Sequence, residues 1–374
     1  MPRWTPPGGG SLREVMSSAA AALGVRGCHD TLGVGRADSV VVLLVDGLGM
    51  LPLRAALEGG GLQLPHLMEA TGAGRVISAP FPSTTPSGLA ALGTGLTTGC
   101  HGIVGASFRL PETGHTLWPL AWRDEPHPIA VQPEATVLER AAAGGVRVTS
   151  VSPRAFESSG LTRAVLRGGD YAGADSLGER VGATARALAG EGRSLVYVYW
   201  GDLDKIGHVH GVDSDEWRAE LELVEVLVGR LVDQLPTSGR LLLTADHGMV
   251  DTDADDRFEI DDDHELRDSA VMLAGEPRMR HVYVRPGAER EVGALWAERL
   301  ADRAVVLSRE QAVAEGWFGS VDPDIADRIG DLVVVASGST VLASQSVDAR
   351  TSALRGQHGA ATEAEMAIPL LAWG

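Results

Sequence analysis

Four short apolar segments alternate with segments of helical character, and this alternation restricts the possible folds more than any other feature of the chain. Each segment is a nearly uninterrupted run of leucine, valine and other strand-favouring residues, which is typical of strands buried on both faces of a parallel sheet. Strands separated by helices predict an α/β fold with a mainly parallel sheet. The four segments are SVVVLLVDG from Ser39, VRVTSVSP from Val146, SLVYVYWGD from Ser194 and RLLLTADHG from Arg240.

A lead-in and one large domain are expected. Residues 1–36 predict a lead-in with one Ala-rich helix, and residues 37–374 a single domain whose last core strand lies in EMAIPLLAWG from Glu365. Between about 251 and 345 a strongly acidic run, which we expect to be an exposed loop, precedes further strand-like and helical segments. We interpret this region as an inserted subdomain. A calcium site in the acidic run is the alternative, but its spacing does not fit an EF-hand loop.

Composition excludes several classes of protein. The formal net charge of −18 argues against a nucleic-acid-polymer binder, which usually carries a basic surface. The only cysteines are Cys28 and Cys100, so a disulfide framework is excluded and two free thiols are expected. The N-terminus lacks the pattern of a signal peptide, and no run of about 18 apolar residues occurs. We therefore expect a cytoplasmic protein without a membrane partner.

Three of the apolar segments end in residues that bind metals. Because the carboxyl ends of parallel strands share one edge of a sheet, these side chains are expected to meet there. Converging carboxylates would repel one another unless cations lie between them. Aspartate and histidine suit zinc, with manganese or iron as alternatives. The residues are Asp46 after the first segment, Asp202, Asp204, His208 and His210 after the third, and Asp246 and His247 after the fourth.

Taken singly, each of these residues also has a purely structural interpretation. Asp46-Gly47 is a favourable turn, and Asp246-His247 could be a buried hydrogen-bonded pair. The spacing of four in DKIGH puts Asp204 and His208 on one face if the segment is helical, whereas a loop could also bring both to one ion. His358, in a glycine-flanked GQHG, is a candidate third ligand because glycines allow a close backbone approach.

Hydroxyl side chains gather in APFPSTTPSGLAALGTG, from Ala79, where a helix is predicted to begin. A hydroxyl at a helix start most often caps the helix. The functional alternative is that Thr84 or Thr85 is a nucleophile activated by a metal. The backbone N–H groups of such a helix start would also favour an anionic substrate.

Together, LVDGLG, FPSTT, DKIGH, ADHGM and GQHG occur in the order found in the alkaline phosphatase superfamily, and the chain resembles its type I phosphodiesterase/nucleotide pyrophosphatase branch. The resemblance runs from about Ser39 to the end and is weakest over 251–345. It implies a three-layer α/β/α sandwich with a mostly parallel central sheet and an inserted cap subdomain. Residues 37–374 would then be the catalytic domain.

The resemblance also implies roles for individual residues. Thr85 would be the nucleophile, because it lies three positions after Pro82, and it would form a phospho-threonine intermediate. Asp202 and His210 fall beside the ligand positions and are candidates for orienting them. Two divalent metal ions are implied, one held by Asp46, Thr85, Asp246 and His247, the other by Asp204, His208 and His358.

The sequence departs from that branch at two places near the nucleophile. Pro86-Ser87 follows Thr85 where the branch has Phe-Pro-Asn, and Ala106 stands where the branch has an asparagine that binds a phosphate oxygen. Trp118 and Trp122 are interpreted as packing residues, with pocket lining as the alternative.

The expected function is metal-dependent hydrolysis of a small phosphate ester, possibly a nucleotide, by a phosphodiesterase or nucleotide pyrophosphatase. The alternatives are a phosphomonoesterase or phosphonate hydrolase, a phosphomutase, and a non-catalytic protein that binds metal or phosphate.

Overall fold

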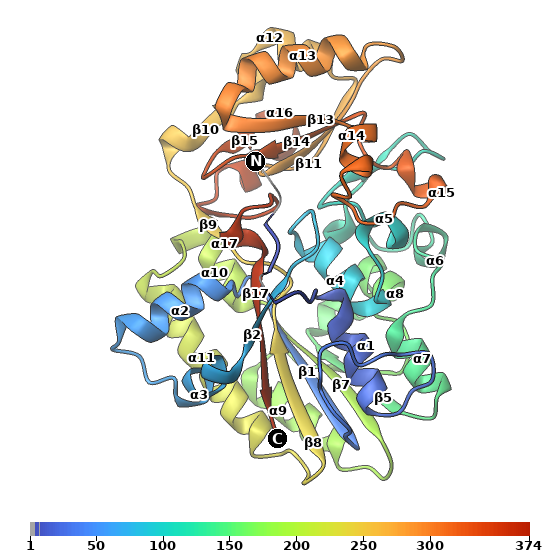
Figure 1. The fold of residues 1–374 in the computed structure, drawn as a ribbon, viewed down its shortest axis with the longest axis vertical. Helices are drawn as coiled ribbons and strands as arrows, with labels where there is room; N and C mark the ends of the chain where they lie inside the picture. Colours follow the sequence, from blue (N-terminus) through green and yellow to red (C-terminus); the bar gives the residue numbers. More distant parts are fainter. Residues whose placement is uncertain (1–3, 7) are drawn as a thin grey trace.

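The computed structural model describes residues 4–6 and 8–374, and a central sheet runs through its larger part (Figure 1). Within these residues seven strands form the sheet, and five of them, from β8 to β6, are parallel. β17 is antiparallel to both of its neighbours. The order is β2 (Arg75–Ser78), β17 (Ala367–Trp373), β8 (Gly239–Thr244), β1 (Ser39–Val45), β7 (Ser194–Trp200), β5 (Arg147–Ser152) and β6 (Asp170–Gly173).

Helices cover both faces of this sheet, so the predicted three-layer α/β/α sandwich is confirmed (Figure 1). β1 has every residue buried, as its uninterrupted apolar run predicts. One face is covered by α1 (Arg13–Ala22), α4 (Thr85–Thr94), α7 (Val137–Ala143) and α8 (Gly160–Val165). The other face carries α2 (Met50–Gly59), α3 (Pro65–Ala73), α9 (Leu177–Leu188), α10 (Asp202–His210) and α11 (Asp215–Val232).

The N-terminal lead-in is part of the main core. Helix α1 contacts β1, α4 and α7, and Leu12, Val15 and Met16 are fully buried. Cys28 and Cys100 are both free thiols, as expected. In the described part of the chain, no helix combines the length and the apolar character that a membrane crossing requires.

A second, antiparallel sheet lies at one end of the molecule, above the carboxyl ends of the parallel strands (Figure 1). A separate apolar cluster, which includes the fully buried Trp296, fills the space between this sheet and its helices. These elements belong to the region that we propose as the inserted cap. They are β11 (Met272–Glu276), β12 (Met279–Tyr283), β14 (Leu332–Ala336) and β13 (Ala304–Ser308), with α12 (His264–Ser269) and α13 (Glu289–Leu300).

The acidic run that follows β8 is not the plain loop expected from its composition. It holds short helical turns and β10 (Arg257–Glu259), which pairs with β15 (Val341–Ala343). Local capping explains this order, because the Asp263 carboxylate accepts hydrogen bonds from the first N–H groups of α12. Both ends of the region are tied together, since β9 (Val250–Asp251) pairs with β16 (Gly356–Gln357).

The remaining elements are short and connect these layers. They are β3 (Phe108–Arg109) and β4 (Thr116–Leu117), with α5 (Thr98–His101), α6 (Pro128–Val131), α14 (Arg309–Ala314), α15 (Pro323–Ala326), α16 (Gln345–Ser352) and α17 (Glu363–Met366).

The central strand β1 generates the first prediction. Leu43 is fully buried between the two helical layers, so Leu43→Ala should lower the free energy of unfolding by about 2–5 kcal/mol. The control is Leu223→Ala on the outer face of α11, where the side chain is 45% exposed and the expected change is within about 0.5 kcal/mol. Urea denaturation followed by circular dichroism measures both. Equal effects of the two changes would contradict the assignment of β1 to the core.

Candidate metal centre and nucleophile

The first group of side chains lies where β1 and β8 end next to each other. Asp46 directly follows β1, while Asp246 and His247 follow β8 after one intervening alanine. The two strands are parallel neighbours, so their carboxyl ends meet at the same edge. All three side chains are buried. The convergence predicted from the strand ends is therefore present in the structure.

His247 is the centre of this first group. Its Nε2 atom lies 3.5 Å from Asp46 Oδ1 and 3.8 Å from Asp246 Oδ2. The same nitrogen is 3.1 Å from Thr85 Oγ1, at the first residue of α4. Four potential ligand atoms from three segments of the chain thus surround one small volume.

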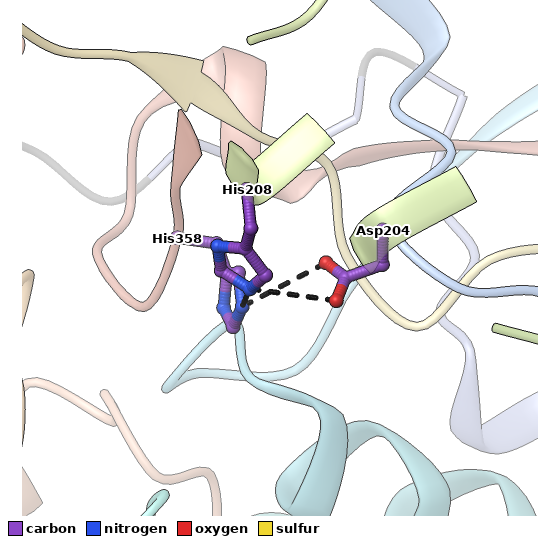
Figure 2. A group of neighbouring side chains, drawn as sticks. All are labelled: Asp204, His208 and His358. Carbon is purple, nitrogen blue, oxygen red and sulfur yellow. Dashed lines mark hydrogen bonds and ion pairs between the residues drawn. The ribbon is translucent and has the colours of Figure 1, made fainter. Parts of the chain in front are cut away.

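The second group is formed by Asp204, His208 and His358 (Figure 2). The DKIGH segment is helical, so Asp204 and His208 lie one turn apart on the same face of α10. His208 Nε2 is 3.4 Å from Asp204 Oδ2 and 3.3 Å from His358 Nε2. His358 Nε2 is in turn 3.9 Å from Asp204 Oδ1. His358 directly follows β16, and β16 pairs with β9. Because β9 comes soon after β8 in the chain, this pairing brings His358 to the edge of the sheet where β8 ends.

Each histidine in the two groups has one ring nitrogen held by a backbone carbonyl group. This contact favours a proton on Nδ1 and leaves the Nε2 lone pair free to bind a metal. The three Nε2 atoms point toward the carboxylates of their groups, as metal ligands do. The Nδ1 contacts are His208 to Gly356 O at 2.7 Å, His247 to Gly248 O at 3.0 Å and His358 to Ser83 O at 3.0 Å.

The carboxylates of the two groups have oxygen atoms without a hydrogen-bond partner among the described residues. These are Asp46 Oδ1, Asp204 Oδ1 and Asp246 Oδ2. A buried carboxylate oxygen without a partner is costly, and a cation is the usual partner of several such oxygens. Within each group the ligand atoms lie within 4.8 Å of one another. The donor set therefore fits a divalent cation in each group.

The electrostatics of the first group lead to the same conclusion. Burial raises the pKa of Asp46 well above its usual value, and the nearby carboxylates of Asp246 and Asp204 raise this pKa further. Burial also raises the pKa of Asp246. Tyr199 donates a hydrogen bond of 2.5 Å to Asp46 Oδ2, which offsets only part of the effect. A bound cation would favour the ionised carboxylates.

Glycine allows the segments of the site to approach so closely. Gly47 has a positive φ of 73°, and a Cβ atom there would lie 2.9 Å from Asp204 Cβ. At Gly88, in α4, a Cβ atom would lie 2.5 Å from Asp246 Cβ. Any larger residue at Gly47 would push the two groups apart, and one at Gly88 would push α4 away from the first group.

The two threonines at the start of α4 have different surroundings. Thr84 occupies the N-cap position, but its side chain makes no capping hydrogen bond. Thr85 contacts His247 instead, so the hydroxyl that faces the first group belongs to Thr85. Asp202 and His210 lie at the two ends of α10, outside both groups. His210 contacts Glu216 at 3.5 Å and is partly exposed.

A cavity of about 310 Å³ opens beside the two groups. Thr85, Asp204, His208 and His358 line it, and so does Ala106. Trp118 also lines this cavity and is 39% exposed, so its interpretation as a packing residue was wrong. Trp122 is 4% exposed and packs in the core, as expected.

Two residues of the site were missed in the sequence. Tyr199 lies in the apolar run of β7, where alternate residues face opposite sides and a hydroxyl looks like core packing. Glu276 ends β11, in the region proposed as the cap, and lines the cavity beside His358. Its Glu-Pro sequence is a common turn pattern, so no local signal distinguishes it.

Comparison with known proteins places the chain in a family. The model of the type I phosphodiesterase/nucleotide pyrophosphatase family matches residues 40–361. A search of curated proteins finds no significant match.

Several solved structures share the fold at low sequence identity. Murine ectonucleotide pyrophosphatase/phosphodiesterase 5 has a TM-score of 0.72 and 20% identity, over 90% of this chain and 88% of that one. An inactive threonine-to-alanine variant of that protein, in complex with AMP, has a TM-score of 0.72 and 19% identity, over 90% and 87%. Phosphonoacetate hydrolase from Sinorhizobium meliloti, in complex with phosphonoformate, has a TM-score of 0.69 and 20% identity, over 89% of each chain.

The family match covers most of the chain and includes every residue of the two groups and Thr85. The chain therefore belongs to the type I phosphodiesterase/nucleotide pyrophosphatase family of the alkaline phosphatase superfamily, a metal-dependent family, and is a phosphoric ester hydrolase.

Proposed function

We propose that this protein hydrolyses a small phosphodiester in two steps, with Thr85 as the nucleophile and two divalent cations as cofactors. The observation that carries the proposal is the position of Thr85. Its Oγ1 atom is 3.1 Å from His247 in the first group, and the residue lines the same cavity as the second group. No other hydroxyl among the described residues has both contacts.

The donor atoms of each group identify the residues that would hold the cations. Asp46, Asp246, His247 and the Thr85 hydroxyl would hold one, and Asp204, His208 and His358 the other. When bound, such cations neutralise negative charge and lower the pKa of a coordinated hydroxyl. Oxygen and nitrogen ligands in these numbers suit zinc, with manganese or iron as alternatives.

The residues of the chain perform the rest of the reaction. The Thr85 oxygen attacks phosphorus, one substituent leaves as an alcohol, and a phospho-threonine remains until water hydrolyses it. The N-terminus of α4 directs its dipole toward the negative phosphoryl oxygens. Burial of the first group keeps the electrostatic attraction strong, because little water competes with it.

Two cavities favour a diester over a monoester. The larger cavity lies on the side of Glu276 and His358, and a smaller one of about 70 Å³ lies on the side of Tyr199 and Phe156. Thr85 lines both, so a phosphorus atom beside it could direct one substituent into each. No lysine or arginine lines either cavity within the described residues, whereas the extra negative charge of a monoester would need one.

The substrate class can be tested with two chromogenic esters. The protein loaded with zinc or manganese is expected to hydrolyse bis-p-nitrophenyl phosphate with a kcat/KM at least about tenfold above that for p-nitrophenyl phosphate, because the second substituent occupies a cavity. Release of p-nitrophenol is followed by absorbance. A preference for the monoester would instead identify a phosphomonoesterase.

The nucleophile can be tested by changing each threonine. Thr85→Ala should lower kcat by about a thousandfold or more, because no other hydroxyl reaches the same place. Thr84→Ala, the matched control, removes the neighbouring hydroxyl and should keep most of the activity. Retention of metal by Thr85→Ala, measured by elemental analysis, separates a lost nucleophile from a lost site. An unchanged rate would exclude Thr85 as the nucleophile. A wild type without turnover would indicate a binding protein, and phosphoryl return to the substrate a phosphomutase.

Asp46 provides a test of the metal. Elemental analysis should find two divalent ions per chain in the wild type and fewer in Asp46→Asn, and a chelator should abolish wild-type hydrolysis. Because the folded state raises the pKa of Asp46, the stability of the metal-free wild type should fall as the pH rises through that raised pKa. Metal-free Asp46→Asn should show a smaller loss, because only the raised pKa of Asp246 remains in this group.

The control for the metal test is the exposed Asp302→Asn, which should keep both the metal content and the pH dependence of the wild type. Thermal denaturation at several pH values measures the stability of all three proteins. A metal-free wild type that is as stable as Asp46→Asn at every pH would argue against repulsion between the buried carboxylates.

A further inference from the structure

A fully buried ion pair joins the region proposed as the cap to the segment that carries His358. Glu365, in α17, and Arg278, in the turn between β11 and β12, are both 0% exposed. Arg278 Nε donates to Glu365 Oε1 at 3.0 Å, and its Nη2 donates to Glu365 Oε2 at 2.9 Å. Apolar side chains of similar size often give equal stability in place of such a pair, so stability alone does not account for it.

The carboxylate of Glu365 holds the backbone that follows His358. Its Oε1 atom accepts a hydrogen bond of 3.0 Å from Ala360 N, two residues after His358. Its Oε2 atom accepts one of 2.5 Å from the hydroxyl of Thr362, the residue that caps α17. Together with the bonds from Arg278, each carboxylate oxygen has two donors. The carboxylate therefore has little freedom to move, and it fixes the loop that it contacts.

The backbone of Glu365 is fixed at the first group. Its carbonyl oxygen accepts a hydrogen bond of 2.8 Å from Gly248 N, directly after His247. Only a glycine allows this close approach, because a Cβ atom at position 248 would collide with Ala364 O. One residue thus contacts the backbone beside a histidine of each group. The position of His358 relative to His247 therefore depends on Glu365.

Arg278 is fixed on its other side by the region proposed as the cap. Its Nη1 atom donates to Thr340 O at 2.5 Å, and its Nη2 atom donates to Gly338 O at 2.7 Å. Because the guanidinium is planar, these bonds also set the direction of the two bonds to Glu365. Neither Arg278 nor Glu365 belongs to the two groups or lines the large cavity. Both would therefore act on a cation only through other residues.

We propose that Glu365 is a positioning residue that holds His358 of the second group in place relative to the first group, and that Arg278 holds Glu365 for this role. The inference rests on the proposed function, because it assumes that the two groups bind cations. It adds a route by which the region proposed as the cap supports the second cation. Loss of a residue that orients a metal ligand typically lowers metal affinity about ten- to a hundredfold.

Zinc binding to the metal-free protein, measured without substrate, provides the test. Competition with a chromophoric chelator gives the affinity of each of the two sites. Glu365→Gln keeps the size of the side chain but replaces one carboxylate oxygen by an amide nitrogen, which accepts no hydrogen bond from Ala360 N or Arg278. One zinc ion should then bind about ten- to a hundredfold more weakly. The other should stay within about threefold of the wild type, because the backbone carbonyl that Gly248 contacts is retained.

A combination with His358→Ala separates positioning from a general loss of stability. If Glu365 acts through His358, Glu365→Gln should cause no further loss of zinc affinity in the His358→Ala background. A merely structural effect of Glu365→Gln would lower the melting temperature in both backgrounds and would not make the affinity change depend on His358.

The matched control is the other buried ion pair of the same region. Arg280 Nη1 and Nη2 donate to Asp348 at 2.5 and 2.9 Å, and the remaining partner of the Asp348 carboxylate is the Ser352 hydroxyl. Asp348→Asn therefore removes a carboxylate charge from a buried arginine pair without a hydrogen bond to either histidine segment among the described residues. It should keep both zinc affinities within about threefold of the wild type.

The outcomes separate this inference from the proposed function. Unchanged zinc affinities in Glu365→Gln, or an equal loss in Asp348→Asn, would overturn the inference alone. If Glu365→Gln does not fold, Arg278→Lys takes its place, since lysine keeps the charge but not the two parallel bonds, and it should weaken one zinc ion about tenfold. Its control is Arg280→Lys. A wild type that binds no zinc, manganese or iron would overturn the cation part of the proposed function and the inference with it.

Discussion

Repulsion among three neighbouring carboxylates, two of them buried and one half-buried, determines the character of this molecule. Asp46, Asp204 and Asp246 lie at one edge of the sheet, and each has an oxygen without a hydrogen-bond partner among the described residues. Such an arrangement opposes folding unless positive charge is supplied from outside the chain. The strands, the close glycines and the apolar layers together must offset this unfavourable energy in the metal-free protein. Stability and the capacity to bind cations therefore oppose each other at the same residues.

The fold resolves this conflict through parallel strands. Since β1, β7 and β8 are neighbours that run in the same direction, residues separated by about 200 positions in the sequence end beside one another. Their apolar runs bury completely between the helical layers and give the edge a rigid base. Rigid support of this kind keeps charged groups in the geometry that catalysis requires, at positions that a flexible loop could not maintain.

Sequence reasoning succeeded where a short pattern determines the local structure. The β-branched runs predicted the core strands, and the acids after them predicted the two groups, because strand direction alone brings those ends together. It failed where long-range packing decides. Trp118 looks like any loop tryptophan until the cavity is seen, and Glu276 ends a short strand whose Glu-Pro sequence suggests only a turn. The order of the acidic run likewise depends on capping and on pairing with a distant strand.

The pairing of β9 with β16 has a consequence for how such proteins diversify. The two segments that lead into and out of the proposed cap lie side by side, and His358 follows the second of them immediately. An insertion joined to the rest of the fold through the β9–β16 pair can be lengthened, shortened or exchanged during evolution. The pair itself would keep His358 in its position. Glu276, which lines the cavity, lies in the exchangeable part, whereas Thr85 and the six residues that would hold the cations lie outside it. A change in the insertion that keeps Arg278 would therefore alter the cavity and leave the two groups intact.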